Sequence, residues 1–156
     1  MKSATINQIQ KELTALEPKQ VQEICMRIAK YKKENKELLS YLLFDAIDEK
    51  RYVENVKKEI DNLFHEINRQ TTYTTKKGLQ KTVRNMNKFI KYSDNKQTEI
   101  ELRIYFCSKV KSARINLDSS NVISNLYYRE KDKIQTAFSK LHEDLQYDYK
   151  DEMERL

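Results

Sequence analysis

Five basic residues in the middle of the chain recur with the spacing of one helical face. They step by four, three, four and three positions and are Lys77, Lys81, Arg84, Lys88 and Lys91. Residues three or four apart lie on the same side of a helix, so this row, which we call the basic ridge, would extend over about 21 Å. The segment 73–93 contains no acidic residue to pair with it. Such a row suits the phosphates of a nucleic acid, an acidic protein or an anionic lipid surface.

Three further basic residues, Lys109, Lys111 and Arg114, would extend the positive charge beyond the next helix. The apolar positions of the ridge segment lie about 200° around the helix from the basic row, so the charges are expected to face solvent. A lysine-rich solvent face that binds nothing specific would have the same pattern. The acidic segment 143–156 could also fold back onto the ridge, or meet the ridge of a second copy. The sequence leaves these alternatives open.

Residues suited to enzymatic chemistry are scarce. The chain has one glycine, Gly78. Glycine-rich phosphate loops and the nucleophile elbow of hydrolases need at least two, so both are excluded. Neither His65 nor His142 has the second histidine of a zinc-binding helix, or the glutamate three residues earlier that di-iron bundles use. Cys25 and Cys107 lie in apolar runs, where burial would suppress thiol reactivity. We therefore predict no catalytic residue, no metal site and no cofactor.

The composition predicts an all-α protein. With one glycine and one proline in 156 residues, the chain lacks the turn residues that strand-rich folds require. The formal net charge of +6 is compatible with a polyanionic partner but does not demand one. No apolar stretch approaches the roughly 20 residues of a membrane span, and the start of the chain lacks the apolar core of a signal peptide. We expect a cytoplasmic protein with no transmembrane segment and with both cysteines as buried free thiols.

Apolar residues with helical periodicity predict about seven antiparallel helices. The first two flank Pro18, a residue that can end one helix and begin the next. The third, at 38–47, has apolar side chains around most of its circumference and is expected to be the most buried. The later helices are expected at 49–69, from a cap at Thr74 or Thr75, from a cap at Asp94, and as one long helix at 120–147 in which Glu130 interrupts the apolar stripe.

The predicted helices could be organised in two ways within a single domain over 1–156. Helical hairpins could stack as a short α-solenoid of the HEAT/armadillo kind, or the helices could form an irregular bundle. A weak internal similarity at an offset of 62 positions relates 18–70 to 74–147 and places Phe44 opposite Phe106. Because amphipathic helices can be aligned by chance, chance and duplication both explain this possible helical repeat.

The segments AKYKKENKELLSYLLF and LHEDLQYDY resemble segments found in a family of small, uncharacterised, all-helical bacterial proteins. The resemblance spans most of the chain and implies a helical fold. It implies no activity, and it transfers no role to any residue of this sequence.

These patterns favour a non-enzymatic helical interaction module, a scaffold or adaptor that presents a surface to a protein partner, because no motif for catalysis competes with that interpretation. The alternative is the binding of a nucleic acid or another polyanion through the basic ridge. The sequence does not decide the oligomeric state.

Overall fold

The computed structural model describes residues 2–156 and divides the chain into two compact units, Met1–Phe44 and Asp45–Leu156. Within the described residues all regular secondary structure is helical and there is no strand, which confirms the prediction of an all-α fold. The sequence predicts one domain over 1–156, whereas the contacts between residues group the chain into these two units. None of the helices at 2–156 is both long enough and apolar enough to cross a membrane.

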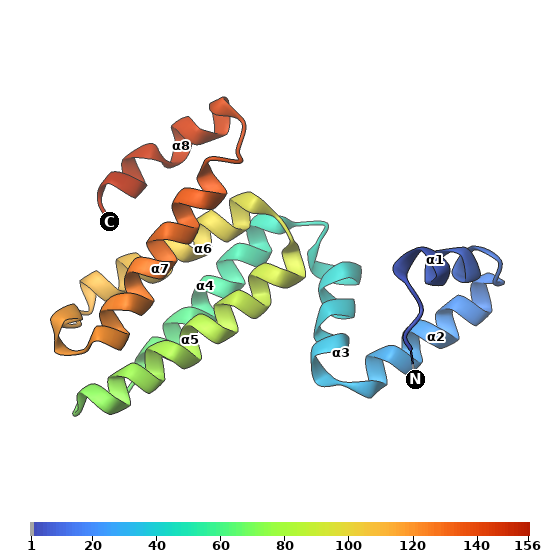
Figure 1. Cartoon of the computed structure of the whole chain (residues 1–156), viewed down its shortest axis with the longest axis horizontal. Helices are drawn as coiled ribbons and strands as arrows, with labels where there is room; N and C mark the ends of the chain where they lie inside the picture. The colour runs from blue at the N-terminus through green and yellow to red at the C-terminus, as the bar shows by residue number, and fades with distance from the viewer. Residues whose placement is uncertain (1) are drawn as a thin grey trace. The chain divides into compact units, whose positions relative to one another are not determined.

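The first unit consists of short amphipathic helices (Figure 1). They are α1 (Ile6–Thr14), α2 (Pro18–Tyr31), α3 (Lys33–Ser40) and the π-helical η1 (Tyr41–Asp45), whose last residue already belongs to the second unit. Thr5 caps α1 in a capping box with Gln8, and Pro18 occupies the first turn of α2, as the sequence predicts. Among the described residues of this unit, Tyr41 alone is buried. The unit therefore has almost no core of its own.

The helix that the sequence predicts to be the most buried is instead strongly exposed. The α-helix ends at Ser40, and the side chains of Leu42, Leu43 and Phe44 are 57%, 63% and 67% exposed. The prediction was wrong because apolar composition identifies side chains that can be buried but does not supply the second surface that covers them. A unit of about 40 residues made of three short helices offers little such surface.

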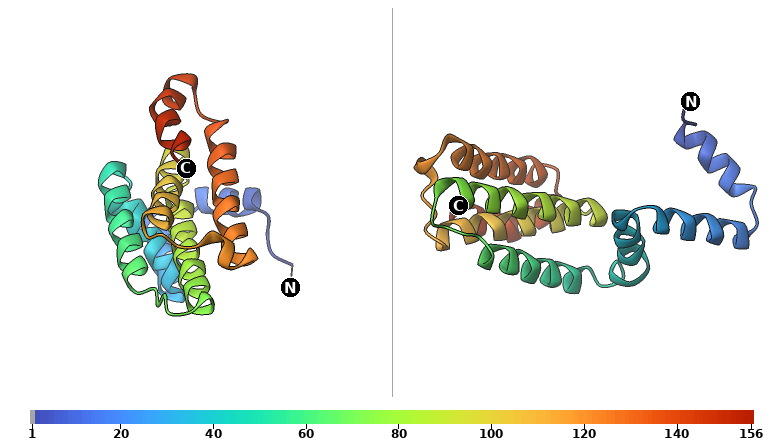
Figure 2. Two further views of the ribbon diagram at one scale, coloured as in Figure 1. Left: turned by 90° about the vertical axis from the view of Figure 1, so that its left-hand side faces the viewer. Right: turned by 90° about the horizontal axis from the view of Figure 1, so that it is seen from below.

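The second unit is an irregular antiparallel helix bundle (Figures 1 and 2). Four helices lie side by side and alternate in direction, followed by the shorter α8. The elements are α4 (Glu49–His65), α5 (Thr72–Ser93), α6 (Lys96–Ser112), the 3₁₀ turn η2 (Leu117–Ser119), α7 (Asn121–Phe138) and α8 (Glu143–Glu154). This arrangement fits the bundle that the sequence allows, and the solenoid is not confirmed.

The core of this unit is built around α6, which packs against α4, α5 and α7. Apolar side chains around most of this helix are buried. They are Ile100, Leu102, Ile104, Phe106, Cys107 and Val110. A helix that buries most of its circumference must be enclosed by neighbours on several sides. Phe106 is fully buried whereas Phe44, its counterpart in the proposed repeat, is 67% exposed, so the two segments do not share an environment.

The end of α4 and two helix caps differ from the predictions. The helix expected at 49–69 ends at His65. Thr71 caps α5 instead of the predicted Thr74 or Thr75, because it forms a capping box with Thr74. Asp94 adopts the left-handed conformation (φ 52°) that ends α5, and its neighbour Asn95 caps α6 in its place.

The predicted long helix at 120–147 is two helices. It breaks after Phe138, and α8 begins after His142, whose side chain accepts a hydrogen bond from the backbone N–H of Asp144. Phe138 and Leu141 continue the apolar spacing of α7 across the break. The periodicity therefore did not reveal that the backbone changes direction.

Gly78 provides close packing and not a turn. It lies inside α5, and a Cβ atom added there would approach Cγ1 of Ile67 to 2.7 Å. Ile67 is buried just beyond the end of α4. The glycine therefore allows α5 to lie directly against the chain that leaves α4.

Candidate functional site

The basic ridge lies on the solvent side of α5. Leu79, Met86 and Ile90 are buried on the opposite side, whereas Val83, which the sequence assigns to the same buried row, is only half-buried. The rotation fixed by these contacts exposes four ridge side chains and leaves Lys88 half-buried. The exposed ones are Lys77, Lys81, Arg84 and Lys91. The predicted orientation of the ridge agrees with the structure.

Local contacts hold some of the ridge side chains. The ammonium of Lys77 lies 4.7 Å from the centre of the Tyr73 ring, and its hydrogen bond to the Tyr73 hydroxyl lowers the pKa of that tyrosine. Lys81 Nζ lies 2.7 Å from Oε2 of Glu66, but both side chains are more than half exposed, so this ion pair contributes little stability. Arg84 is exposed, and no ion pair joins it to another described residue.

The predicted extension of the ridge beyond the next helix is largely occupied by contacts within the bundle. Lys109 Nζ lies 2.7 Å from Oδ1 of Asp61, and the hydrogen bond between them raises the pKa of Lys109. Lys111 Nζ donates a hydrogen bond of 2.8 Å to the backbone carbonyl of Arg155. Arg114 is exposed just beyond the end of α6 in a left-handed conformation (φ 52°). Lys109 and Lys111 thus have structural partners, and Arg114 remains available to solvent.

The acidic C-terminal segment lies against α6 and α7, away from the ridge. Besides the bond from Lys111 to its backbone, the Tyr127 hydroxyl donates to the carbonyl of Leu156 at 3.0 Å. The Tyr149 hydroxyl donates to Oε1 of Glu101 at 3.0 Å, and burial raises the pKa of Tyr149 to about 12. Within its own unit, the C-terminal segment therefore does not neutralise the ridge.

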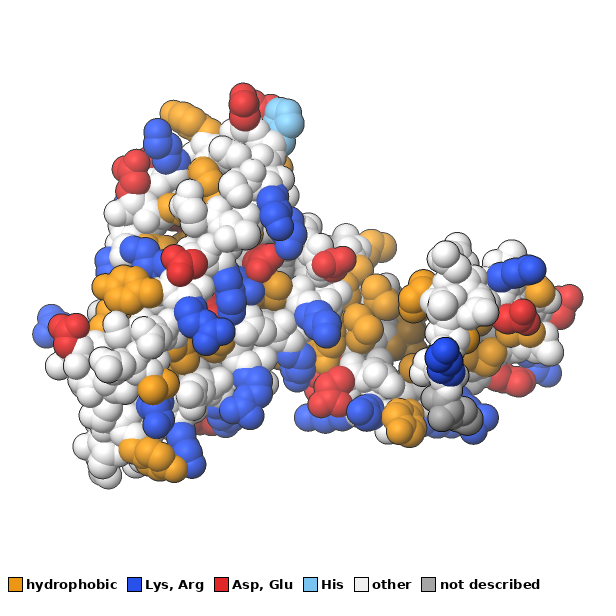
Figure 3. Space-filling model, in the orientation of Figure 1, with side chains coloured by type: hydrophobic (Ala, Val, Ile, Leu, Met, Phe, Trp, Pro, Cys, Tyr) orange, Lys and Arg blue, Asp and Glu red, His pale blue; other side chains and the backbone are white. Residues whose placement is uncertain are grey.

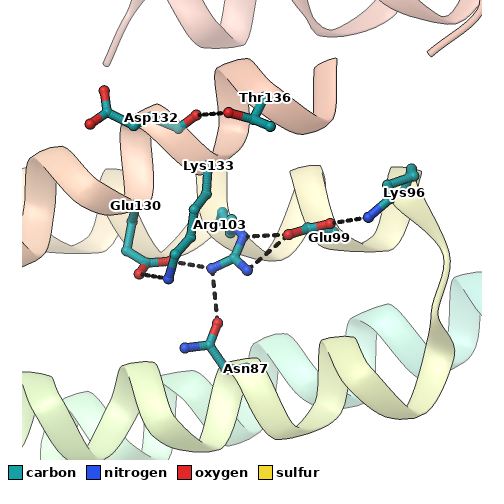
Figure 4. Close-up of polar contacts among 8 residues, drawn as sticks. All are labelled: Asn87, Lys96, Glu99, Arg103, Glu130, Asp132, Lys133 and Thr136. Carbon is teal, nitrogen blue, oxygen red and sulfur yellow. Dashed lines mark hydrogen bonds and ion pairs between the residues drawn. The ribbon is translucent and has the colours of Figure 1, made fainter. Parts of the chain in front are cut away.

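A charged network centred on the buried side chains of Arg103 and Glu130 lies between α5, α6 and α7 (Figure 4). Arg103 Nη1 donates to Oε2 of Glu130 and, at 2.9 Å, to Oδ1 of Asn87. Its Nε and Nη2 donate to Oε1 of Glu99 at 3.1 and 2.9 Å. Lys133 Nζ, 2.7 Å from Oε1 of Glu130, completes the partners of this carboxylate. Two anions and two cations therefore share one contact region, which offsets the cost of removing them from water.

The sequence shows only a faint sign of this network. Glu130 interrupts the apolar stripe of its helix. Arg103 lies between Leu102 and Ile104, and nothing in its spacing distinguishes it from an arginine on the surface of a helix. The two residues are 27 positions apart, and only the packing of α6 against α7 makes them partners.

The histidines and cysteines do not assemble into a site. In the part of the chain that the structure describes, no group of three or more His, Cys, Asp or Glu side chains could hold a metal ion. Cys107 is buried as predicted, and burial raises the pKa of its thiol to about 12, far above the range of a reactive thiolate. Cys25 is exposed, contrary to the prediction of a buried thiol, because α2 lies in the unit that has almost no core.

No protein-family model, curated protein or solved structure matches this chain.

Proposed function

We propose that this chain is a non-enzymatic protein-binding module and that the unit Met1–Phe44 supplies its contact surface. The supporting observation is the exposure of eleven large apolar side chains on this unit. They are Ile6, Ile9, Leu13, Ile24, Met26, Ile28, Tyr31, Leu38, Leu42, Leu43 and Phe44. Amphipathic helices with an exposed apolar side recur in recognition by insertion into apolar grooves.

The amount of exposed apolar surface is unusual for a free unit of this size. Each of these eleven side chains is more than a third exposed. Monomeric soluble proteins rarely expose contiguous apolar patches larger than a few hundred Å², and larger patches mark interaction sites. A standard interface covers about 800 Å² on each partner. Eleven exposed large apolar side chains on one small unit can supply the apolar part of such an interface.

The charges of the same unit indicate the chemistry of the partner. Over residues 1–44 the chain has eight Lys or Arg residues and five Glu residues. A partner with an apolar surface bordered by acidic side chains complements both features. The proposed partner is a different protein, because a second copy of this unit, which also has more basic than acidic residues, would not supply the acidic border.

The proposal is tested with two matched double variants. Tyr31→Gln/Phe44→Gln removes two aromatic side chains that are 78% and 67% exposed on the first unit. Tyr73→Gln/Tyr147→Gln removes two that are 57% and 83% exposed on the second. Proteins captured from the source cells by wild type, but not by the first variant, are purified and their affinity is measured by calorimetry. We expect about a tenfold or greater loss with the first variant and less than about twofold with the second.

If both variants bound the partner with equal affinity, the first unit would not be part of the interface. Sedimentation velocity of wild type across a concentration series tests the remaining possibility. A dimer that the Tyr31→Gln/Phe44→Gln change dissociates would show that the apolar faces join copies of this chain, which contradicts a different partner.

The binding of nucleic acid through the basic ridge is a second candidate function. It is supported by the solvent exposure of Lys77, Lys81, Arg84 and Lys91 and by the position of the acidic segment on α6 and α7. Fluorescence anisotropy with a labelled 20-nucleotide strand, titrated at several salt concentrations, tests it. Wild type should bind at low salt with an affinity that falls steeply as salt rises, and Lys77→Gln/Lys91→Gln should weaken both the affinity and this dependence. Absence of binding at low salt would exclude it.

A further inference from the structure

A groove with polar, positively charged walls lies between α5 and α7. Its volume is about 450 Å³, within the range of about 300–1,000 Å³ typical of ligand sites. Arg84 and Asn87 line it from α5, and Arg129 and Lys133 line it from α7. In the space-filling view, Lys and Arg side chains gather where these two helices lie beside each other (Figure 3). Arg84 belongs to both the groove and the basic ridge.

The charges of this groove are not balanced by the chain itself. Its one acidic wall residue, Glu130, is buried and already accepts hydrogen bonds from Arg103 and Lys133. Arg84 and Arg129 are exposed, and within residues 2–156 neither makes an ion pair. Because the carboxylate of Glu130 is bonded to Arg103 and Lys133, the two guanidinium groups that line the groove have no anionic partner and repel each other. An anion from outside the chain would remove that repulsion.

We propose that this groove binds phosphates of a single-stranded nucleic acid. This inference rests on the second candidate function, and it assigns the central contacts of that function to Arg84 and Arg129. A guanidinium group presents paired N–H donors that match two phosphate oxygens, which makes arginine suited to this ligand. The amides of Asn87, Asn125 and Gln80 add donors and acceptors to the same walls.

The position of the groove favours a single strand over a duplex. It lies between two helices, and from Arg84 the basic ridge continues along α5 in both directions. A flexible strand can follow the ridge and place two neighbouring phosphates between the helices, one near each arginine. A duplex is a stiff rod whose phosphates would reach the exposed ridge without entering the groove.

The experiment compares three double variants that each remove two positive charges. Arg84→Gln/Arg129→Gln changes the groove, and Lys77→Gln/Lys91→Gln changes the ridge outside it. Arg51→Gln/Lys58→Gln is the control, because both residues are exposed on α4. All are exposed positions at which glutamine preserves helix propensity, and circular dichroism verifies folding. Binding to a labelled 20-nucleotide single strand and to the corresponding duplex is measured across a salt series.

We expect the groove variant to lose about tenfold or more in affinity for the single strand and about 1.4 in the slope of log K against log salt, the value for two lost phosphate contacts. The control should lose less than about twofold. Arg84→Lys/Arg129→Lys should keep most of the slope but recover only part of the affinity, because lysine keeps the charge and lacks the paired donors.

The outcomes separate the groove from the wider function. If wild type binds neither nucleic acid at low salt, both proposals fail. If wild type binds and the ridge variant is weakened while the groove variant equals the control, the groove proposal fails and nucleic-acid binding stands. Equal loss of duplex and single-strand binding in the groove variant would overturn the preference for a single strand.

Discussion

Arg103 and Glu130 are charged residues at the centre of a small bundle, with side chains only 6% and 3% exposed. Removing ions from water costs several kcal/mol each, and their attraction offsets this only when the remaining hydrogen-bonding groups are also satisfied. Here Glu99, Asn87 and Lys133 provide those additional partners. In the described part of the chain, no buried side-chain N or O atom is left without a hydrogen-bond partner.

Removing one member of this pair should be far more harmful than removing a charge at its edge. Arg103→Leu leaves Glu130 and Glu99 without their shared guanidinium, so we expect the free energy of unfolding to fall by about 3 kcal/mol. Lys96→Gln removes an exposed contact to Glu99 and should cost less than about 1 kcal/mol. Urea denaturation followed by circular dichroism measures both. A cost below about 0.5 kcal/mol for Arg103→Leu would show that the network does not stabilise the fold.

At the scale of helices, α3 with η1 and α6 differ in how completely neighbours cover them. Leu42 is 57% exposed and Leu102 is fully buried. Leu42→Asp places a carboxylate in water, so we expect a change in stability below about 1 kcal/mol. Leu102→Asp buries an unpaired charge and should prevent folding of the second unit. Thermal denaturation monitored by circular dichroism distinguishes the two. A melting temperature strongly lowered by Leu42→Asp would mean that this leucine is covered in solution.

The sequence predicted the helices well but not which of them would be buried. Apolar periodicity gave the solvent orientation of the ridge, because that property depends on one helix alone. The segment around Leu42 is more continuously apolar than α6, in which Glu99 and Arg103 alternate with apolar residues, and it was therefore wrongly expected to form the core. The proximity of Arg84 to Arg129 depends on the packing of α5 against α7, which no local pattern encodes.

At the scale of the molecule, the burial is concentrated in one of the two units. Among residues 2–156, all the buried apolar side chains except that of Tyr41 belong to Asp45–Leu156. A fragment of residues 45–156 should therefore fold alone, with a helical spectrum and a cooperative thermal transition close to that of the intact chain. Limited proteolysis of the intact protein should release a fragment of similar size. A fragment that shows no cooperative transition would mean that the first unit is needed to complete the core.

The pairing of Arg103 with Glu130 also bears on the order of events during synthesis. Glu130 is added 27 residues after Arg103, a delay of about one to five seconds at usual translation rates. During that interval α4, α5 and α6 can collapse, but the guanidinium lacks one of its two carboxylates, and full burial of α6 is unfavourable. Once α7 has been synthesised, it supplies both the carboxylate of Glu130 and the helix that covers the exposed side of α6. Folding of the nascent chain should therefore be completed late and in one step, without a stable three-helix intermediate.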